Sequence, residues 1–103
     1  MDKYSIIATV KEVRGFCPIY GEGDRMVFES HYIKSKESCD VCIHAMSSML
    51  TLLSAFIHGI SAVDLGIGKQ EDTGYLQCPD PGEPHTCGGT VVFRLERKKL
   101  STT

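Results

Sequence analysis

The sequence predicts an α+β domain in which one small antiparallel or mixed sheet packs on a single long central helix, in the order β-β-α-β-β. Apolar and polar residues alternate at both ends of the chain, and an uncharged segment with helical periodicity occupies its middle. A length of 103 residues is enough for one modest core. We therefore expect residues 1–103 to form a single domain that ends in a polar tail, 97–103.

Four segments carry strand signals. Residues 4–11 alternate between apolar and polar side chains, which predicts a first strand of about ten residues that ends before Pro18. Residues 25–29 follow a glycine-rich turn and are expected to form a short second strand. Residues 74–78 are expected to form the third strand, and the alternation over 91–96 predicts the last one.

The middle of the chain gives the clearest helix signal. Its apolar residues recur every three or four positions between Cys42 and Ile60, and Ser38 or Asp40 can cap the helix. The opposite side carries small or uncharged groups instead of Lys and Glu, which predicts a helix that is covered nearly all round.

Because one sheet covers only one side of this helix, its second side needs another partner. We consider two alternatives. Either the loop 60–72 folds back over that side, or the face of Ser47, Thr51 and Ser54 packs against a second copy in a homo-oligomer.

Charge and hydropathy exclude several classes of partner. The chain carries 11 Lys and Arg against 13 Asp and Glu, a formal net charge of −2, so we expect no nucleic-acid partner. Residues 41–63 are uncharged, but they include several serines and two histidines and lack flanking aromatic or basic anchors, so we expect no membrane span. The N-terminus does not resemble a secretory signal, which predicts a cytoplasmic protein.

The cysteines carry the chemistry that the sequence suggests. There are five of them: Cys17, Cys39, Cys42, Cys78 and Cys87. In a reducing compartment they are expected to be metal ligands, catalytic thiols or reduced core residues, and not a disulfide framework. Cys39 and Cys42 form a CxxC pair at the expected helix start, where unpaired N–H groups favour thiolates.

Cys17, Cys78 and Cys87 lie where elements end. If the first and third strands run in the same direction, all three lie at one end of the sheet, and the helix can start there as well. Four or five sulfurs would then surround a common centre, either Zn²⁺ or an iron–sulfur cluster, and the spacing does not choose between the two. Proline after Cys17 and Cys78 stiffens both loops, which suits a metal site.

The histidines are weaker candidates. His44 and His58 lie on the expected helix, where a histidine is more often a packing residue than a ligand, and neither is assigned to the metal. His85, two residues before Cys87, is a better substitute ligand.

Two other classes of function stay open. One is a homo-oligomeric structural or interaction domain, joined through the central helix, whose cysteines are reduced and free of metal. The other is a thiol oxidoreductase with Cys39 as a low-pKa nucleophile and Cys42 as the resolving thiol. The sequence contains no recognisable catalytic carboxylate pair or nucleophile elbow, so no catalytic residue is assigned.

Several short motifs extend over nearly the whole chain. They are the Cys17-Pro18 step with a Gly23-Asp24 turn, the Cys39-x4-His44-Ala45 spacing, the Cys78-Pro79-Asp80-Pro81 run and the final Val92-x-Arg94-x-Glu96-Arg97 strand. In these motifs the chain resembles an uncharacterised family of small single-domain prokaryotic proteins. The resemblance implies that Cys17, Cys39 and Cys78 are the shared trio, with Cys42 or Cys87 as the additional sulfur. It implies no activity.

Overall fold

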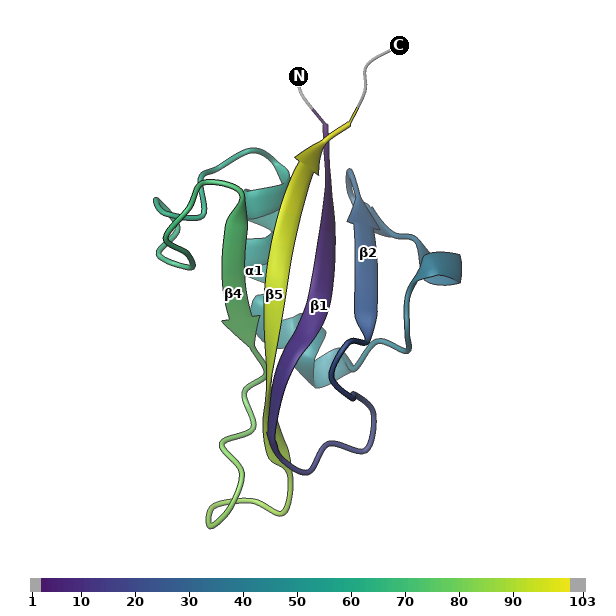
Figure 1. Ribbon diagram of the computed structural model, residues 1–103, viewed down its shortest axis with the longest axis vertical. Helices are drawn as coiled ribbons and strands as arrows, with labels where there is room; N and C mark the ends of the chain where they lie inside the picture. Colours follow the sequence, from purple (N-terminus) through teal and green to yellow (C-terminus); the bar gives the residue numbers. More distant parts are fainter. Residues whose placement is uncertain (1–2, 101–103) are drawn as a thin grey trace.

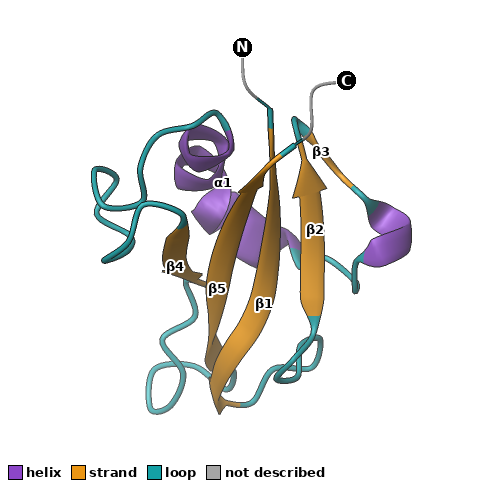
Figure 2. Ribbon diagram, turned by 45° about the horizontal axis from the view of Figure 1, so that its top comes forward, coloured by secondary structure: helices purple, strands orange, loops and turns teal. Residues whose placement is uncertain are grey.

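The computed structural model describes residues 3–100 and confirms the predicted α+β class. One antiparallel sheet forms the first layer, and one α-helix lies across a face of this sheet as the second layer (Figure 1). Figure 2 shows the same two layers with the helix behind the strands. In chain order the elements are β1 (Tyr4–Gly15), β2 (Arg25–Glu29), β3 (Tyr32–Ile33), the 3-10 helix η1 (Ser35–Glu37), α1 (Ile43–Ile57), β4 (Thr73–Gln77) and β5 (Gly89–Lys99).

The strands lie in the order β3-β2-β1-β5-β4, and every neighbouring pair is antiparallel. The longest pairing joins β1 to β5 and runs from Tyr4 opposite Lys99 to Gly15 opposite Gly89. A bulge between Val10 and Glu12 interrupts its register. These two strands therefore form a ribbon that extends past the other strands at one end of the sheet (Figure 1).

The predicted β-β-α-β-β order omits β3. This strand is only two residues long and pairs with the end of β2, Tyr32 opposite Glu29 and Ile33 opposite Phe28. The chain reverses between the two strands at Ser30, whose φ is 59°. A two-residue strand is too short to show alternation, so the pattern of hydrophobic residues could not reveal it.

The core lies between the sheet and α1. Alternate residues of the strands point toward the helix, as the period of two requires, and the buried face of the helix meets them. The buried side chains of this layer are Ile6, Ala8 and Val10 of β1, Met26 and Phe28 of β2, Val91, Phe93 and Leu95 of β5, and Ala45, Met49, Leu53, Phe56 and Ile57 of α1. Burial of each large apolar side chain contributes about 1.5–3 kcal/mol of transfer free energy, which holds the two layers together.

The prediction of a polar tail is wrong for residues 97–99, and residues 101–103 of that tail lie outside the described part of the chain. β5 continues to Lys99, and Arg97 is only 7% exposed. Its guanidinium donates hydrogen bonds to the carbonyl oxygens of Phe56 and Ile60, each at 2.7 Å, and pairs with the carboxylate of Asp72 at 2.8 Å. Arg97 thus adds a donor to the carbonyl of Phe56 in the last turn of α1 and one to the carbonyl of Ile60 just beyond the helix.

The start of α1 also differs from the prediction. Neither Ser38 nor Asp40 caps the helix; the N-cap residue is Cys42, in an extended conformation, and its side chain makes no capping bond. The Ser38 hydroxyl is engaged elsewhere, because it donates to the carbonyl of Lys34 and accepts the N–H of Val27. The helix ends at Ile57, before Gly59 turns the chain with a φ of 105°.

The second side of α1 is not covered within the single chain. The loop 60–72 packs against β4 instead, with the N–H of Tyr75 donating to the carbonyl of Ile67 at 2.7 Å. Ile43 and Leu50 are 78% and 55% exposed. The exposed positions on this side also include Ser47, Thr51 and Ser54. The alternative in which loop 60–72 folds back over this side is therefore wrong, and the homo-oligomer stays a prediction.

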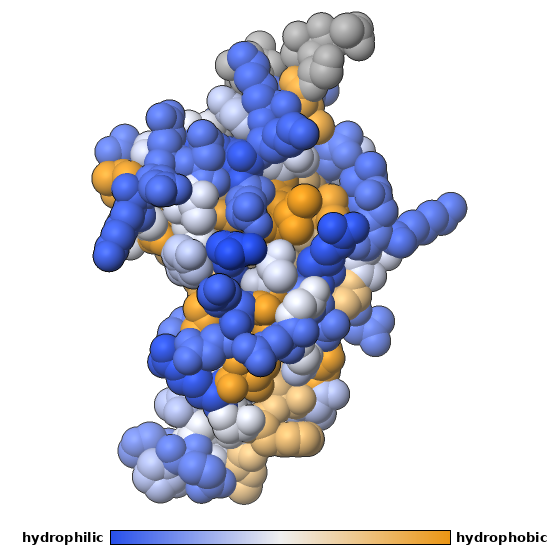
Figure 3. Space-filling model, viewed as in Figure 1, coloured by the Kyte–Doolittle hydropathy of each residue, from blue (hydrophilic) through white to orange (hydrophobic). Residues whose placement is uncertain are grey.

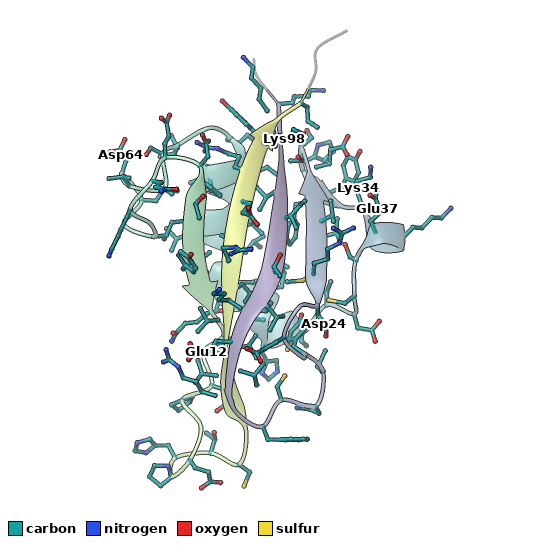
Figure 4. All side chains as sticks on the ribbon, in the orientation of Figure 1. Glu12, Asp24, Lys34, Glu37, Asp64 and Lys98 are labelled. Atoms are coloured by element: carbon teal, nitrogen blue, oxygen red, sulfur yellow. The ribbon has the colours of Figure 1, made fainter. Side chains whose placement is uncertain are left out.

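The other face of the sheet, which α1 leaves open, carries many charged side chains with apolar patches between them (Figure 3). At the edge of the molecule, Lys34 forms ion pairs with Glu29 at 3.2 Å and with Glu37 at 2.8 Å; Figure 4 shows Lys34 and Glu37 side by side next to η1. Within residues 3–100, no helix has the length and apolar character needed to span a bilayer.

Candidate functional site

Strand direction brings the cysteine-bearing segments to one end of the molecule. β1 and β4 both pair antiparallel with β5, so they run in the same direction. The loop after β1, the loop between β4 and β5, and the first turn of α1 therefore meet there (Figure 1). We call this end the cysteine pole, formed by residues 16–24, 78–88 and 42–45. The predicted convergence of these element ends is confirmed.

A pocket of about 730 Å³ opens at the cysteine pole. Cys17, Cys42 and Cys78 line it, each from a different segment of the chain. Most of its other lining residues are apolar, and its polar members include Tyr20 and His44. Three of the five predicted sulfur ligands thus share one largely apolar hollow.

Two of these three sulfur atoms accept a hydrogen bond from the backbone. The N–H of Tyr20 donates to Cys17 Sγ at 3.3 Å, because the chain bends at Pro18 and brings that N–H back over the sulfur. The N–H of Val91 donates to Cys78 Sγ at 3.2 Å from the neighbouring strand. These two bonds fix the positions of the sulfur atoms. The Cys78 thiol in turn donates a hydrogen bond to the carbonyl of Gly89 at 3.6 Å.

Tyr20 connects the first cysteine turn to the start of α1. Its hydroxyl accepts the N–H of Cys42 at 2.7 Å, and its ring packs edge-on against Phe93 with centroids 5.2 Å apart. Burial raises the pKa of the Tyr20 hydroxyl, while the bond from the Cys42 backbone opposes the shift. Tyr20 is therefore a neutral positioning group that holds Cys42 at the pocket.

Cys39 lies outside the lining of this pocket. Its N–H donates to the carbonyl of Arg25 at 2.9 Å, which ties it to the start of β2. Burial raises the pKa of the Cys39 thiol, and the negative charge of Asp24 acts in the same direction; Figure 4 shows Asp24 beside β2. A low-pKa nucleophile needs the opposite shift, so this environment does not favour the oxidoreductase hypothesis.

The CxxC segment does not form a turn, because no turn or bend occurs from Cys39 to Cys42. All five cysteines have free thiols in the structure.

Cys87 and His85 are exposed in the loop between β4 and β5, and neither lines the pocket. Asp80 does line it, but its carboxylate accepts hydrogen bonds from the Thr86 hydroxyl and the N–H of Gly82, which hold its pKa below the usual value. His44, which the sequence analysis did not assign to the metal, lines the pocket two residues after Cys42. The short Cys42-x-His44 spacing was the available signal.

Within residues 3–100, no group of three or more His, Cys, Asp or Glu side chains is already assembled as a metal-binding cluster. A comparison of the chain with protein-family models, curated proteins and solved structures finds no match. The resemblance carried by the Cys-Pro motifs stays a prediction.

Proposed function

We propose that the protein binds a metal centre, Zn²⁺ or an iron–sulfur cluster, at the cysteine pole, with Cys17, Cys42 and Cys78 as its core ligands. The observation that carries this proposal is the pair of backbone N–H groups aimed at Cys17 Sγ and Cys78 Sγ, in a pocket that Cys42 shares. Hydrogen bonds to ligand sulfurs are a regular feature of thiolate metal sites, where they tune the metal.

Cys42 replaces Cys39 in the proposed trio because Cys39 lies outside the pocket lining and is held to Arg25. Soft thiolate ligands select ions such as Zn²⁺ and Cu⁺, or iron–sulfur clusters. In many small proteins the ligand side chains reach their final positions only when the metal binds. On this proposal, the side chains of Cys17, Cys42 and Cys78 rotate toward the metal as it binds. Three protein ligands leave a fourth coordination position, which is consistent with an accessory or carrier role in metal or sulfur metabolism.

Elemental analysis and an absorption spectrum of protein purified without exposure to air test this proposal. We expect bound zinc, or iron with sulfide, at about one centre per chain. Single Cys17→Ser, Cys42→Ser and Cys78→Ser variants should lose most of the metal, whereas Cys87→Ser, an exposed cysteine outside the pocket, should retain it. A folded wild-type protein that takes up neither Zn²⁺ nor iron and sulfide contradicts the proposal.

A second candidate function is homo-oligomerisation through α1. The observation that favours it is the exposed, uncharged side of the helix, which carries Ile43 and Leu50. Two copies can pack such a face together without placing like charges opposite each other. Light scattering across a range of concentrations should detect a dimer or larger assembly, and Leu50→Glu should shift it toward the monomer. A wild-type monomer at every concentration contradicts this second candidate.

We also propose a cytosolic location. A reducing compartment keeps thiols from forming disulfides, and all five cysteines are free. Cell fractionation tests this location, and recovery of the protein in an oxidising compartment would contradict it.

A further inference from the structure

We infer that His44 is the fourth ligand at the cysteine pole, so that Cys17, Cys42, Cys78 and His44 hold one tetrahedral ion of the Zn²⁺ class. This inference rests on the proposed metal binding and deepens it, because it names the fourth donor and chooses a single ion over an iron–sulfur cluster. Three cysteines and one histidine are an established ligand set for structural zinc.

The position of His44 supports this role. It lies in the first turn of α1, two residues after Cys42, and it lines the same pocket as the three cysteines. It also lines an adjoining hollow together with Pro79, the residue that follows Cys78. His44 therefore borders two hollows that the loop carrying Cys78 also lines.

The ring nitrogens of His44 are available. The side chain is exposed, and it makes no hydrogen bond within the part of the chain that the structure describes. Two other histidines differ in this respect: His58 Nδ1 is bonded to the carbonyl of Ser54 at 2.7 Å, and His31 Nδ1 to the hydroxyl of Ser30 at 3.3 Å. A neutral imidazole with a free nitrogen is the form that coordinates a metal.

The other candidates for the fourth position are less well placed. Cys39 lies outside the pocket lining, as do His85 and Cys87 in their exposed loop. Asp80 lines the pocket, but its carboxylate is engaged by the loop itself. His44 is thus the nitrogen donor that shares the hollow with all three sulfurs.

Charge favours the same set. Three thiolates and one neutral imidazole around a divalent ion carry a net charge of −1, and a fourth thiolate would make it −2. The first turn of α1 contains no acidic residue, and its N-cap side chain makes no capping bond within the described chain. The partial positive charge of this helix end therefore favours an anionic complex.

Co²⁺ is the probe for the test, because its visible spectrum reports the number and type of ligands in a zinc site. Reduced, metal-free protein is titrated with Co²⁺ in the absence of air, and Zn²⁺ affinity is then measured by displacement. Wild type should bind one equivalent in tetrahedral geometry with strong thiolate-to-metal absorption. His44→Gln should keep the thiolate absorption, shift the ligand-field bands and weaken binding by more than about 100-fold, since outer-shell groups alone are worth about 10–100-fold.

Two matched variants complete the design. His58→Gln changes a histidine at the other end of α1, and His85→Gln changes the competing nitrogen donor; both should retain the wild-type spectrum and affinity. A wild-type spectrum in His44→Gln, or a shift in His85→Gln instead, overturns the assignment of His44. Failure of wild type to bind either Co²⁺ or Zn²⁺, with stable uptake of iron and sulfide, overturns the single-ion centre but leaves the cysteine site. Failure to bind any of these metals overturns the proposed function itself.

Discussion

Arg97 joins three parts of the fold, and its replacement by methionine should destabilise the protein strongly. Methionine keeps the apolar packing beside the rings of Tyr4 and Phe56 but removes every hydrogen-bond donor. In the variant, the carbonyl of Ile60 loses the hydrogen bond that the Arg97 guanidinium donates to it. This bond is only partly buried, so its loss costs about 1–2 kcal/mol.

The remaining contributions of Arg97 are smaller. The carbonyl of Phe56 still accepts a hydrogen bond from the N–H of Gly59 at 3.1 Å. Loss of its second hydrogen bond, from Arg97, therefore costs about 1 kcal/mol. The side chain of Asp72 is 61% exposed, and solvent screening limits that ion pair to about 0.5 kcal/mol. Arg97→Met should therefore lower the free energy of unfolding by about 3 kcal/mol, a large part of the about 5–15 kcal/mol typical of a domain.

Urea denaturation of the metal-free protein measures this loss. With an m-value of about 1.2 kcal/mol/M, the midpoint should fall by about 2–3 M while the m-value stays constant. Lys98→Met is the matched control, because Lys98 is exposed on the adjacent position of β5, and its midpoint should change little. A shift below about 0.5 M in Arg97→Met would refute the idea that this guanidinium stabilises the end of α1.

Three further predictions concern the cysteine pole and the residues next to it. Tyr20→Phe removes the acceptor for the N–H of Cys42, so it should lower stability by about 1–2 kcal/mol in urea denaturation; an unchanged midpoint contradicts this. Gly89→Ala should lower the melting temperature sharply, because a Cβ would lie 2.2 Å from a carbonyl oxygen of β1; wild-type melting contradicts the tight pairing. Cys39 should react with iodoacetamide more slowly than exposed Cys87 at pH 8, because its raised pKa leaves less thiolate; equal rates by mass spectrometry contradict this.

The fold was predictable where burial follows a local period. β2 has the bounds that were expected, and β1 and β5 differ from expectation mainly in length, because alternation shows which residues face the core. Arg97 was misassigned for a physical reason. Arg97 occupies a position of β5 whose side chain points into the core. A charged residue is predicted to be exposed to solvent unless the buried acceptors of its hydrogen bonds are known.

The candidate site was predictable in its general position but not in its membership. The breaks after Cys17 and Cys78 predicted that element ends meet at one pole on the condition that the first and third strands run in the same direction, and the structure supplied that direction. The choice between Cys39 and Cys42 depended on contacts from distant segments: the carbonyl of Arg25 holds one residue, and the hydroxyl of Tyr20 holds the other. Spacing along the chain contains no information about such contacts.

By itself, the sequence determined the two layers, the uncharged helix and the end of the sheet where the loops carrying Cys17 and Cys78 lie, because these features follow from periodicity and chain connectivity. Only the tertiary structure decided that Cys42 shares a pocket with Cys17 and Cys78 and that His44 lies beside them. The physical reason is that side chains meet through backbone hydrogen bonds and packing between segments far apart in sequence, which no local pattern encodes.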